Sequence, residues 1–444
     1  MLNLSTKNIL KVTVPIMLGT FIQNIVLITD SILVNKLGTI NFDAANNAGL
    51  LYVCFFMLLR GMGDGTQIQI AKEYGQNKLI DIKNTLSNSF LLQVILSSLI
   101  FIFLFYFKDD FLSAIVKSDE IRPKMALFLE YRSWGIFFAS LQVSIVAFFI
   151  GVGKTRIIIV STLLLALSNI FLDFGLIFGM FGLPEMGLRG AALASTIAEG
   201  ITFVFLFINL LYHPDFKLFK FTLFKERIYT LKTNLLLKLS TPLMIRGFIA
   251  LCTWFVFFSL IEQMGEIELE SAHVVRNLFF LTFIPIFGFG SATRTYVAFY
   301  NGKKENHNIK KALKKLMMLS VMFYFVIFHG AVLYPKLMVR LITQNEIIVD
   351  ISAQILNIVF WSMLLYAVVN VVYNAISALG KTMLSLLIET IAILLYLYST
   401  YLVIIKWNWS IVNIWYVEFV YFITLGLLSV IYLRYYQKNT LKTE

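Results

Sequence analysis

Twelve apolar stretches constrain the fold of this chain more than any other feature. Each is long enough to cross a bilayer as a helix, which takes about 20 predominantly apolar residues. Alternating ten-residue segments of the kind that build membrane β-barrels are absent from the sequence. We therefore predict an all-α polytopic membrane protein with twelve transmembrane helices. The stretches lie near residues 9–35, 44–70, 85–107, 124–150, 156–181, 188–211, 236–260, 270–298, 309–331, 350–376, 382–405 and 410–434.

The distribution of positive charge predicts the orientation of these helices. A net charge of +12 would suggest nucleic-acid binding in a soluble protein. Here most of the 37 Lys and Arg residues fall in the two tails and the even-numbered loops. Because short cytoplasmic loops are enriched in Lys and Arg, we expect both termini in the cytoplasm, in a bacterial or archaeal plasma membrane. No nucleic-acid partner is needed to explain the charge.

The chain also contains an internal repeat. The segment that starts at Val14 aligns without gaps to the segment that starts at Thr241, and two later blocks align at the same offset. The repeat unit holds six helices, so both halves enter the membrane from the same side. Such parallel repeats are typical of transporters with a binding site between two lobes and with alternating access. The paired residues include Pro15/Pro242, Gly38/Gly265, Gly61/Gly288, Gly75/Gly302 and Thr155/Thr382.

This repeat predicts the domain organisation. A six-helix N-terminal lobe spans residues 1–211, and a six-helix C-terminal lobe spans residues 235–444. They are joined by a basic, aromatic cytoplasmic loop at 212–234, whose composition is typical of a segment lying on a membrane surface. The apolar stretch after Lys7 and Lys11 is expected to be a retained first helix rather than a signal peptide.

Two carboxylates inside the predicted spans of the N-terminal lobe are candidates for ion coupling. Ionisable residues within a membrane cost about 2.5–3.5 kcal/mol each on insertion scales and are usually functional. Asp30 and Asp173 have no acidic counterpart at the paired positions of the second half. Asn169 lies four residues before Asp173, so both share a helix face. Such a site could exchange a proton or, with further oxygen ligands, hold Na⁺. The alternative is that the two acids pair with Arg60 or Arg132.

Arginines in the C-terminal spans give a second set of candidates. Arg246 and Arg276 lie deep in their predicted helices, where they could contact a substrate or pair with Glu389 and Glu418. Both Cys residues and all four His residues are scattered along the chain, so we expect no metal centre, no disulfide and no organic cofactor. The absence of a nucleophile or of clustered acids argues against an enzyme. The short loops argue against a receptor or scaffold.

Several motifs together resemble the multidrug and toxic compound extrusion (MATE) family over essentially the whole chain. The most specific block is Asn169-x-x-x-Asp173, which is followed by Gly190-Ala-Ala-x-Ala194. The other motifs are Pro15 with Gln23 and Asp30 at fixed spacing, Lys36-Leu37-Gly38, the G-x-G-x-x-T segment from Gly61, and Gly151-x-Gly-Lys-Thr155.

The resemblance implies an antiporter that exports amphiphilic or cationic small molecules in exchange for Na⁺ or H⁺. It assigns the cation site to Asp30, Asn169, Asp173 and Ser195. Family members that use a Glu eight residues after the seventh-helix proline differ from this chain, which has Ala250 there. We expect a monomer in the lipid bilayer. The substrate-cavity candidates are Gln23, Arg246, Arg276 and Glu389.

A flippase for lipid-linked oligosaccharides is the alternative function. Its substrate would carry an anionic headgroup, which Arg246 and Arg276 would contact. The two functions make opposite predictions for substitution of these arginines and of Asp30.

Overall fold

The computed structural model describes residues 2–212 and 230–440, and every regular element in these ranges is helical. The chain forms two compact units. One consists of Val14–Met244, and the other of Met1–Thr13 with Ile245–Glu444. We call them the N-terminal and the C-terminal unit. Their boundaries fall inside two helices that each contain a proline near the boundary, Pro15 and Pro242.

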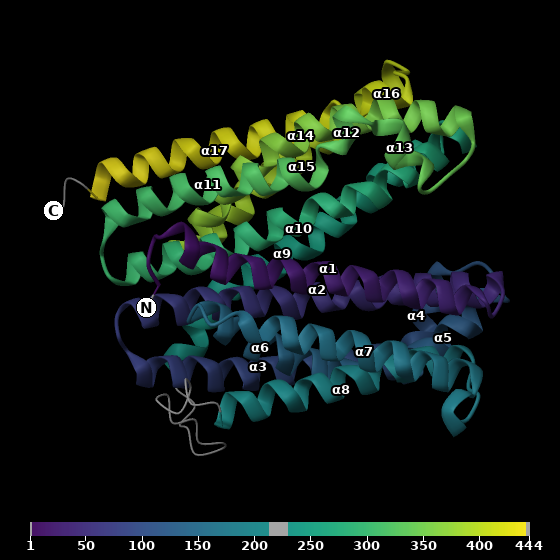
Figure 1. Ribbon diagram of the computed structural model, residues 1–444, viewed down its shortest axis with the longest axis horizontal. Helices are drawn as coiled ribbons and strands as arrows, with labels where there is room; N and C mark the ends of the chain where they lie inside the picture. The colour runs from purple at the N-terminus through teal and green to yellow at the C-terminus, as the bar shows by residue number, and fades with distance from the viewer. Residues whose placement is uncertain (1, 213–229, 441–444) are drawn as a thin grey trace. The chain divides into compact units, whose positions relative to one another are not determined.

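The first half of the chain contains eight α-helices and a 3₁₀ turn in its described residues. Within the N-terminal unit, α2 packs against α3, α5 and α6, and α7 packs along α8 (Figure 1). The elements are α1 (Thr6–Asn35), α2 (Thr39–Gly75), α3 (Leu79–Tyr106), α4 (Lys108–Ile115), α5 (Ile121–Arg132), α6 (Gly135–Gly151), α7 (Arg156–Phe178), η1 (Met180–Gly182) and α8 (Leu188–Tyr212).

The second half contains nine α-helices and a π-helix in its described residues. Within the C-terminal unit, α10 packs against α11 and α14, and α17 packs against α14 and α15 (Figure 1). The elements are α9 (Thr230–Glu262), α10 (Glu266–Gly302), α11 (Asn306–Phe328), α12 (Gly330–Leu333), α13 (Pro335–Arg340), α14 (Glu346–Ala378), α15 (Thr382–Tyr401), the π-helical η3 (Leu402–Lys406), α16 (Ile411–Ile414) and α17 (Val417–Thr440).

The described helices follow the spans that the sequence predicts. Ten of them are long and apolar enough to cross a membrane, and the bent pair α5–α6 makes up to eleven. α11 lies at the predicted span 309–331 but does not pass the same test, because its 23 residues begin with the basic sequence NHNIKKALKKL. The predicted loop 212–234 lies largely outside the described residues, and α9 already begins at Thr230. The short helices α4 and α13 lie where the sequence predicts loops, and α12 begins at the end of the span predicted at 309–331.

Glycines set the closest helix contacts in the N-terminal unit. A side chain on Gly61 would lie 2.5 Å from the Cα atom of Met244, and one on Gly65 would overlap Ser240. These two glycines are four residues apart on α2, so they let the first half of α9 approach its backbone closely. A side chain on Gly190 would overlap the carbonyl oxygen of Leu176, which brings α8 against the end of α7.

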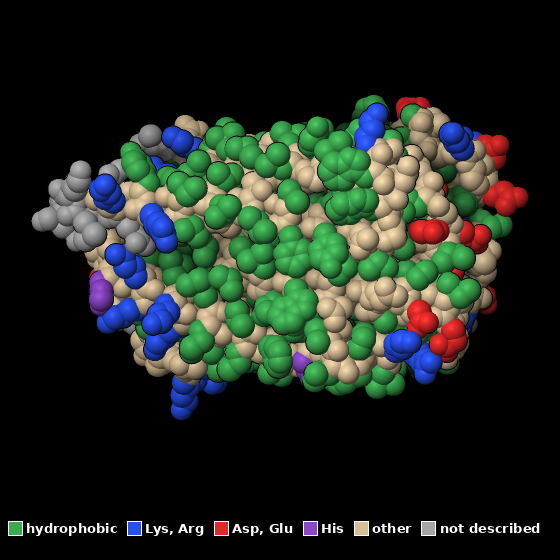
Figure 2. Space-filling model, turned by 90° about the horizontal axis from the view of Figure 1, so that it is seen from above, with side chains coloured by type: hydrophobic (Ala, Val, Ile, Leu, Met, Phe, Trp, Pro, Cys, Tyr) green, Lys and Arg blue, Asp and Glu red, His purple; other side chains and the backbone are tan. Residues whose placement is uncertain are grey.

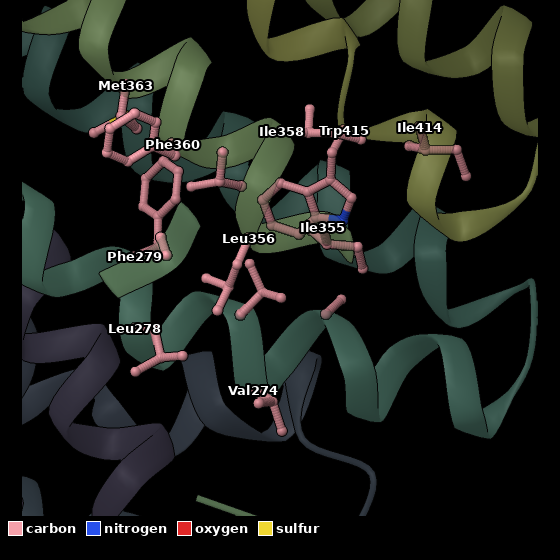
Figure 3. Close-up of a cluster of buried hydrophobic side chains, with 14 of the residues drawn as sticks. Val274, Leu278, Phe279, Ile355, Leu356, Ile358, Phe360, Met363, Ile414 and Trp415 are labelled. Carbon is pink, nitrogen blue, oxygen red and sulfur yellow. The ribbon is translucent and has the colours of Figure 1, made fainter. Parts of the chain in front are cut away.

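Large apolar side chains fill the core of the C-terminal unit. Phe279 of α10, Phe360 of α14 and Trp415, which follows α16, are almost completely buried in one cluster (Figure 3). Their close packing explains why these helices associate even though their outer faces are also apolar. The cluster includes Phe257 of α9, whose ring meets that of Trp415 edge to face with a centroid separation of 5.4 Å.

Charge is segregated along the helices. The 37-residue helix α10 starts with Glu266 and Glu268 and is followed directly by Lys303 and Lys304. On the face shown in Figure 2, hydrophobic side chains cover the middle, Lys and Arg gather at one end, and most Asp and Glu lie at the other. An apolar band between two charged ends is what a bilayer requires of the protein surface.

Candidate functional site

The four predicted cation-site residues come from three helices of the N-terminal unit. Asp30 lies in the last turns of α1, Asn169 and Asp173 lie on α7, and Ser195 lies on α8. The Asn169 side-chain nitrogen lies 3.5 Å from the Ser195 hydroxyl. The carboxyl groups of Asp30 and Asp173 lie close enough to act on each other electrostatically. The fold thus brings all four residues into one region, although Asp30 and Asp173 are far apart in sequence.

Burial makes the oxygen atoms of this region unusual. Asn169 and Asp173 are only 2% and 1% exposed. In the part of the chain that the structure describes, Asp30 Oδ1, Asn169 Oδ1 and Asp173 Oδ2 are buried without a hydrogen-bond donor. Buried polar atoms almost always have a partner, so each exception needs an explanation. Three acceptor oxygens from neighbouring side chains would be satisfied by a proton or by a small hard cation.

Arg132 is one of the two arginines, with Arg60, that the sequence offers as partners for Asp30 and Asp173, and its hydrogen bonds go to Glu199. Its guanidinium donates two hydrogen bonds to the carboxylate of Glu199, one of them 2.8 Å long. It also lies over the ring of Tyr52, 3.9 Å from the ring centroid. The sequence could not reveal this ion pair, because its members lie on different helices and follow no motif.

The substrate-cavity candidates divide between the two units. Gln23 is exposed on α1 of the N-terminal unit. In the C-terminal unit, the guanidinium of Arg246 lies 5.3 Å from the ring centroid of Tyr373, and that of Arg276 lies 4.9 Å from the ring centroid of Phe258. Both arginines therefore rest on aromatic faces, a stabilising arrangement for a cation.

Tyrosines surround the two buried glutamates of the C-terminal unit. The Tyr421 hydroxyl donates to Glu389 over 2.9 Å, and the Tyr396 hydroxyl donates to Glu418 over 3.2 Å. Arg246 and Glu389 both act electrostatically on Tyr373, so they are neighbours. These tyrosines were not among the sequence candidates; their only signal was a hydroxyl-bearing aromatic residue in an otherwise apolar span.

No group of three or more His, Cys, Asp and Glu side chains suited to a metal ion occurs in residues 2–212 and 230–440. The candidate cation site has two acids, an amide and a hydroxyl. That donor set resembles a site for H⁺ or Na⁺ more than a transition-metal centre.

A buried acidic pair inside a duplicated six-helix membrane bundle is typical of secondary transporters. The MatE family model matches residues 15–174 and 242–402, so the chain belongs to the MatE family. The two matched segments begin at Pro15 and Pro242, which are the prolines that the internal repeat pairs. The resemblance to MATE transporters is thereby confirmed.

Curated relatives agree with this assignment. The chain is 26% identical over 394 residues to "Probable multidrug resistance protein NorM" of Thermotoga maritima, covering 87% of this chain and 83% of the relative. It is 23% identical to "Probable multidrug resistance protein YoeA" of Bacillus subtilis, covering 86% and 82%. Both relatives are named as probable multidrug resistance proteins.

Solved structures share the fold. An outward-facing multidrug resistance MATE family transporter of the MOP superfamily aligns with a TM-score of 0.87 at 18% identity, covering 98% of this chain and 96% of the other. A MATE protein in the straight conformation aligns with a TM-score of 0.88 at 18% identity, covering 98% and 96%. These alignments confirm the twelve-helix architecture.

Proposed function

We propose that the chain is a secondary active efflux transporter of the plasma membrane. It would export amphiphilic or cationic small molecules in exchange for Na⁺ or H⁺, as a monomer with both termini in the cytoplasm. It would need no cofactor beyond the coupling ion. The observation that carries the proposal is the set of three donorless buried oxygens on Asp30, Asn169 and Asp173, in a chain whose curated relatives are named for multidrug resistance.

The coupling chemistry follows from the acidic pair. Two carboxylates side by side in an apolar environment cannot both stay ionised without a proton or cation between them. Binding of that cation would then be the event that changes the free-energy difference between inward-open and outward-open states. Ser195 and Asn169 would complete the oxygen ligands. Alternating access would link this event to export.

Substrate contacts are proposed for Gln23, Arg246, Arg276 and Glu389. The exposed amide of Gln23 can donate and accept hydrogen bonds. Glu389 could attract a cationic group, whereas the tyrosines that surround it offer ring faces to an amphiphile. Arg246 lies near Glu389 and would partly neutralise its negative charge.

The flippase alternative is not favoured. It needs Arg246 and Arg276 as contacts for an anionic headgroup, but both guanidiniums rest on aromatic rings of their own unit. The relatives that align over most of the chain are named as multidrug resistance proteins.

The test is transport by the purified protein in proteoliposomes. Export of a fluorescent cationic dye is measured under a Na⁺ gradient alone and under a proton gradient alone. We expect one of the two gradients to drive transport and Asp30→Asn to abolish the gradient-dependent part. Asp119→Asn is the matched control, because Asp119 is a solvent-exposed carboxylate paired with Arg122 at the surface.

Undiminished gradient-driven transport by Asp30→Asn would refute the proposed coupling site. Loss of function in Arg246→Gln and Arg276→Gln with full function in Asp30→Asn would instead restore the flippase alternative.

A further inference from the structure

The ion pair between Arg132 and Glu199 lies beside the proposed cation site, and the coupling mechanism proposed above does not use it. Arg132 is the last residue of α5, where the chain bends by 52° before α6 begins. The side chains of Arg132 and Glu199 are only 13% and 15% exposed. The bidentate contact and the Tyr52 ring hold the guanidinium in one place.

The surrounding residues are shaped to accept this pair. A side chain on Gly135 would overlap both Arg132 Nη1 and Glu199 Oε2, so only glycine leaves room for it. The Gln142 amide donates a 2.7 Å hydrogen bond to the main-chain oxygen of Glu199. The Thr196 hydroxyl donates to the main-chain oxygen of Tyr131 over 3.2 Å. These bonds tie α8 to α5 and α6 on both sides of the pair.

Arg132 also acts electrostatically on Asp30. The hydrogen bonds of the guanidinium go to Glu199, and its charge also acts on Asp30. A bidentate arginine–carboxylate pair is stronger than a single contact and fixed in geometry. In the described residues, Asp30 Oδ1 is buried and accepts no hydrogen bond from Arg132.

The internal repeat argues that the fold does not require this pair. At the offset that pairs Pro15 with Pro242, Arg132 corresponds to Val359 and Glu199 to Gly426. The two charged residues are thus confined to the half of the chain that also contains the acidic pair. Their co-occurrence with that pair points to a shared role.

We propose that Glu199 is a positioning residue for cation coupling: it holds Arg132 and cancels its charge, which keeps Asp30 and Asp173 free for the coupling cation. This inference rests on the proposed function of that acidic pair. Without Glu199, the guanidinium would turn to Asp30 and compete with the cation. By Coulomb's law, two unit charges about 7 Å apart at an effective dielectric constant of about 20 interact strongly enough to change an affinity more than tenfold.

Three variants test the proposal: Glu199→Gln, Arg132→Gln, and the double variant with both substitutions. The measured quantity is the concentration of the driving cation at half-maximal dye transport in proteoliposomes. We expect it to rise by about tenfold or more in Glu199→Gln and to return to within about threefold of the wild-type value in the double variant. In Arg132→Gln, which leaves an extra carboxylate, we expect it to fall.

A purely structural role for the pair predicts a different pattern. Both single variants would then lower the folded yield and the maximal rate, with the half-maximal cation concentration unchanged. That result, or a failure of the double variant to restore cation affinity, would overturn the proposal. If Glu199→Gln does not fold, an unchanged or raised value in Arg132→Gln overturns it as well.

A second readout separates this inference from the proposed transport activity. A cation that binds only the folded protein raises its unfolding temperature. We expect NaCl or acidification to stabilise the wild type in detergent, Glu199→Gln to lose that response, and the double variant to regain it. A wild type without gradient-driven transport would refute the function alone. A response that persists in Glu199→Gln would refute the positioning role alone.

Discussion

Replacing Lys232 with methionine should destabilise the N-terminal unit, because Lys232 neutralises a buried carboxylate. Lys232 lies in the first turn of α9, and its Nζ atom is 2.6 Å from Glu73 Oε1 and 3.3 Å from Asp81 Oδ1. The Glu73 side chain is only 2% exposed. It also accepts hydrogen bonds from Gln69 and from Thr85, between 2.8 and 3.0 Å long.

The expected loss of stability is about 2–3 kcal/mol. Removing one partner of a buried ion pair typically costs about 3–5 kcal/mol, since it leaves an uncompensated charge. The Lys232 side chain is 22% exposed, and Glu73 keeps its bonds to Gln69 and Thr85. For both reasons, we expect a loss of stability below about 3–5 kcal/mol. The double variant, Lys232→Met with Glu73→Gln, should be more stable than Lys232→Met alone. It leaves no buried carboxylate without a positive partner.

Thermal unfolding in detergent measures this effect. For a unit of this size, about 1 kcal/mol corresponds to about 2–4 °C, so Lys232→Met should lower the melting temperature by about 5–10 °C. The control is Lys336→Met, which removes an exposed lysine paired with the exposed Asp350 and should have little effect. A double variant that is less stable than Lys232→Met alone would refute the reasoning.

Three further predictions concern packing and topology. Gly190→Ala should reduce the yield of folded protein by forcing α8 away from the Leu176 carbonyl, at a cost of about 1–3 kcal/mol; size-exclusion chromatography measures it, and a wild-type elution profile would contradict it. Gly49→Ala should be tolerated in the same assay, since nothing lies within 4 Å of a side chain there. With Cys54 and Cys252 replaced by serine, a Lys438→Cys variant should react with an impermeant maleimide in inside-out vesicles only; labelling of intact cells would place the C-terminus outside.

Most of the backbone could be predicted from the apolar pattern and the repeat. The repeat recurs in the structure, where α2 and α10 both have 37 residues. The backbone also has positive φ angles at two matching positions, Asn77 and Lys304. Each is the second residue after its helix, α2 or α10, and lies where the chain turns. The sequence predicts one span at 124–150. In the structure, the chain bends between Arg132 and Gly135, where no proline signals a bend.

The sequence singles out the acids of the candidate site but not the ion pairs around it. Asp30 and Asp173 stand out because a charge in an apolar span is rare. Which arginine accompanies which carboxylate depends on tertiary contacts, and the sequence left Arg132 open between several partners. The sequence does not indicate that Glu73 is buried either, because this residue lies in a polar segment typical of a helix end.

The internal repeat also indicates which side chains the fold does not require. The position of Asp30 is occupied in the other half by Phe257, an aromatic residue in the middle of the C-terminal core. The same helical scaffold therefore accepts either a charge or a large apolar ring at that point. The residues at paired positions of one half therefore indicate which side chains the fold of the other half can accept. The shared helical scaffold therefore does not itself require a carboxylate at this point.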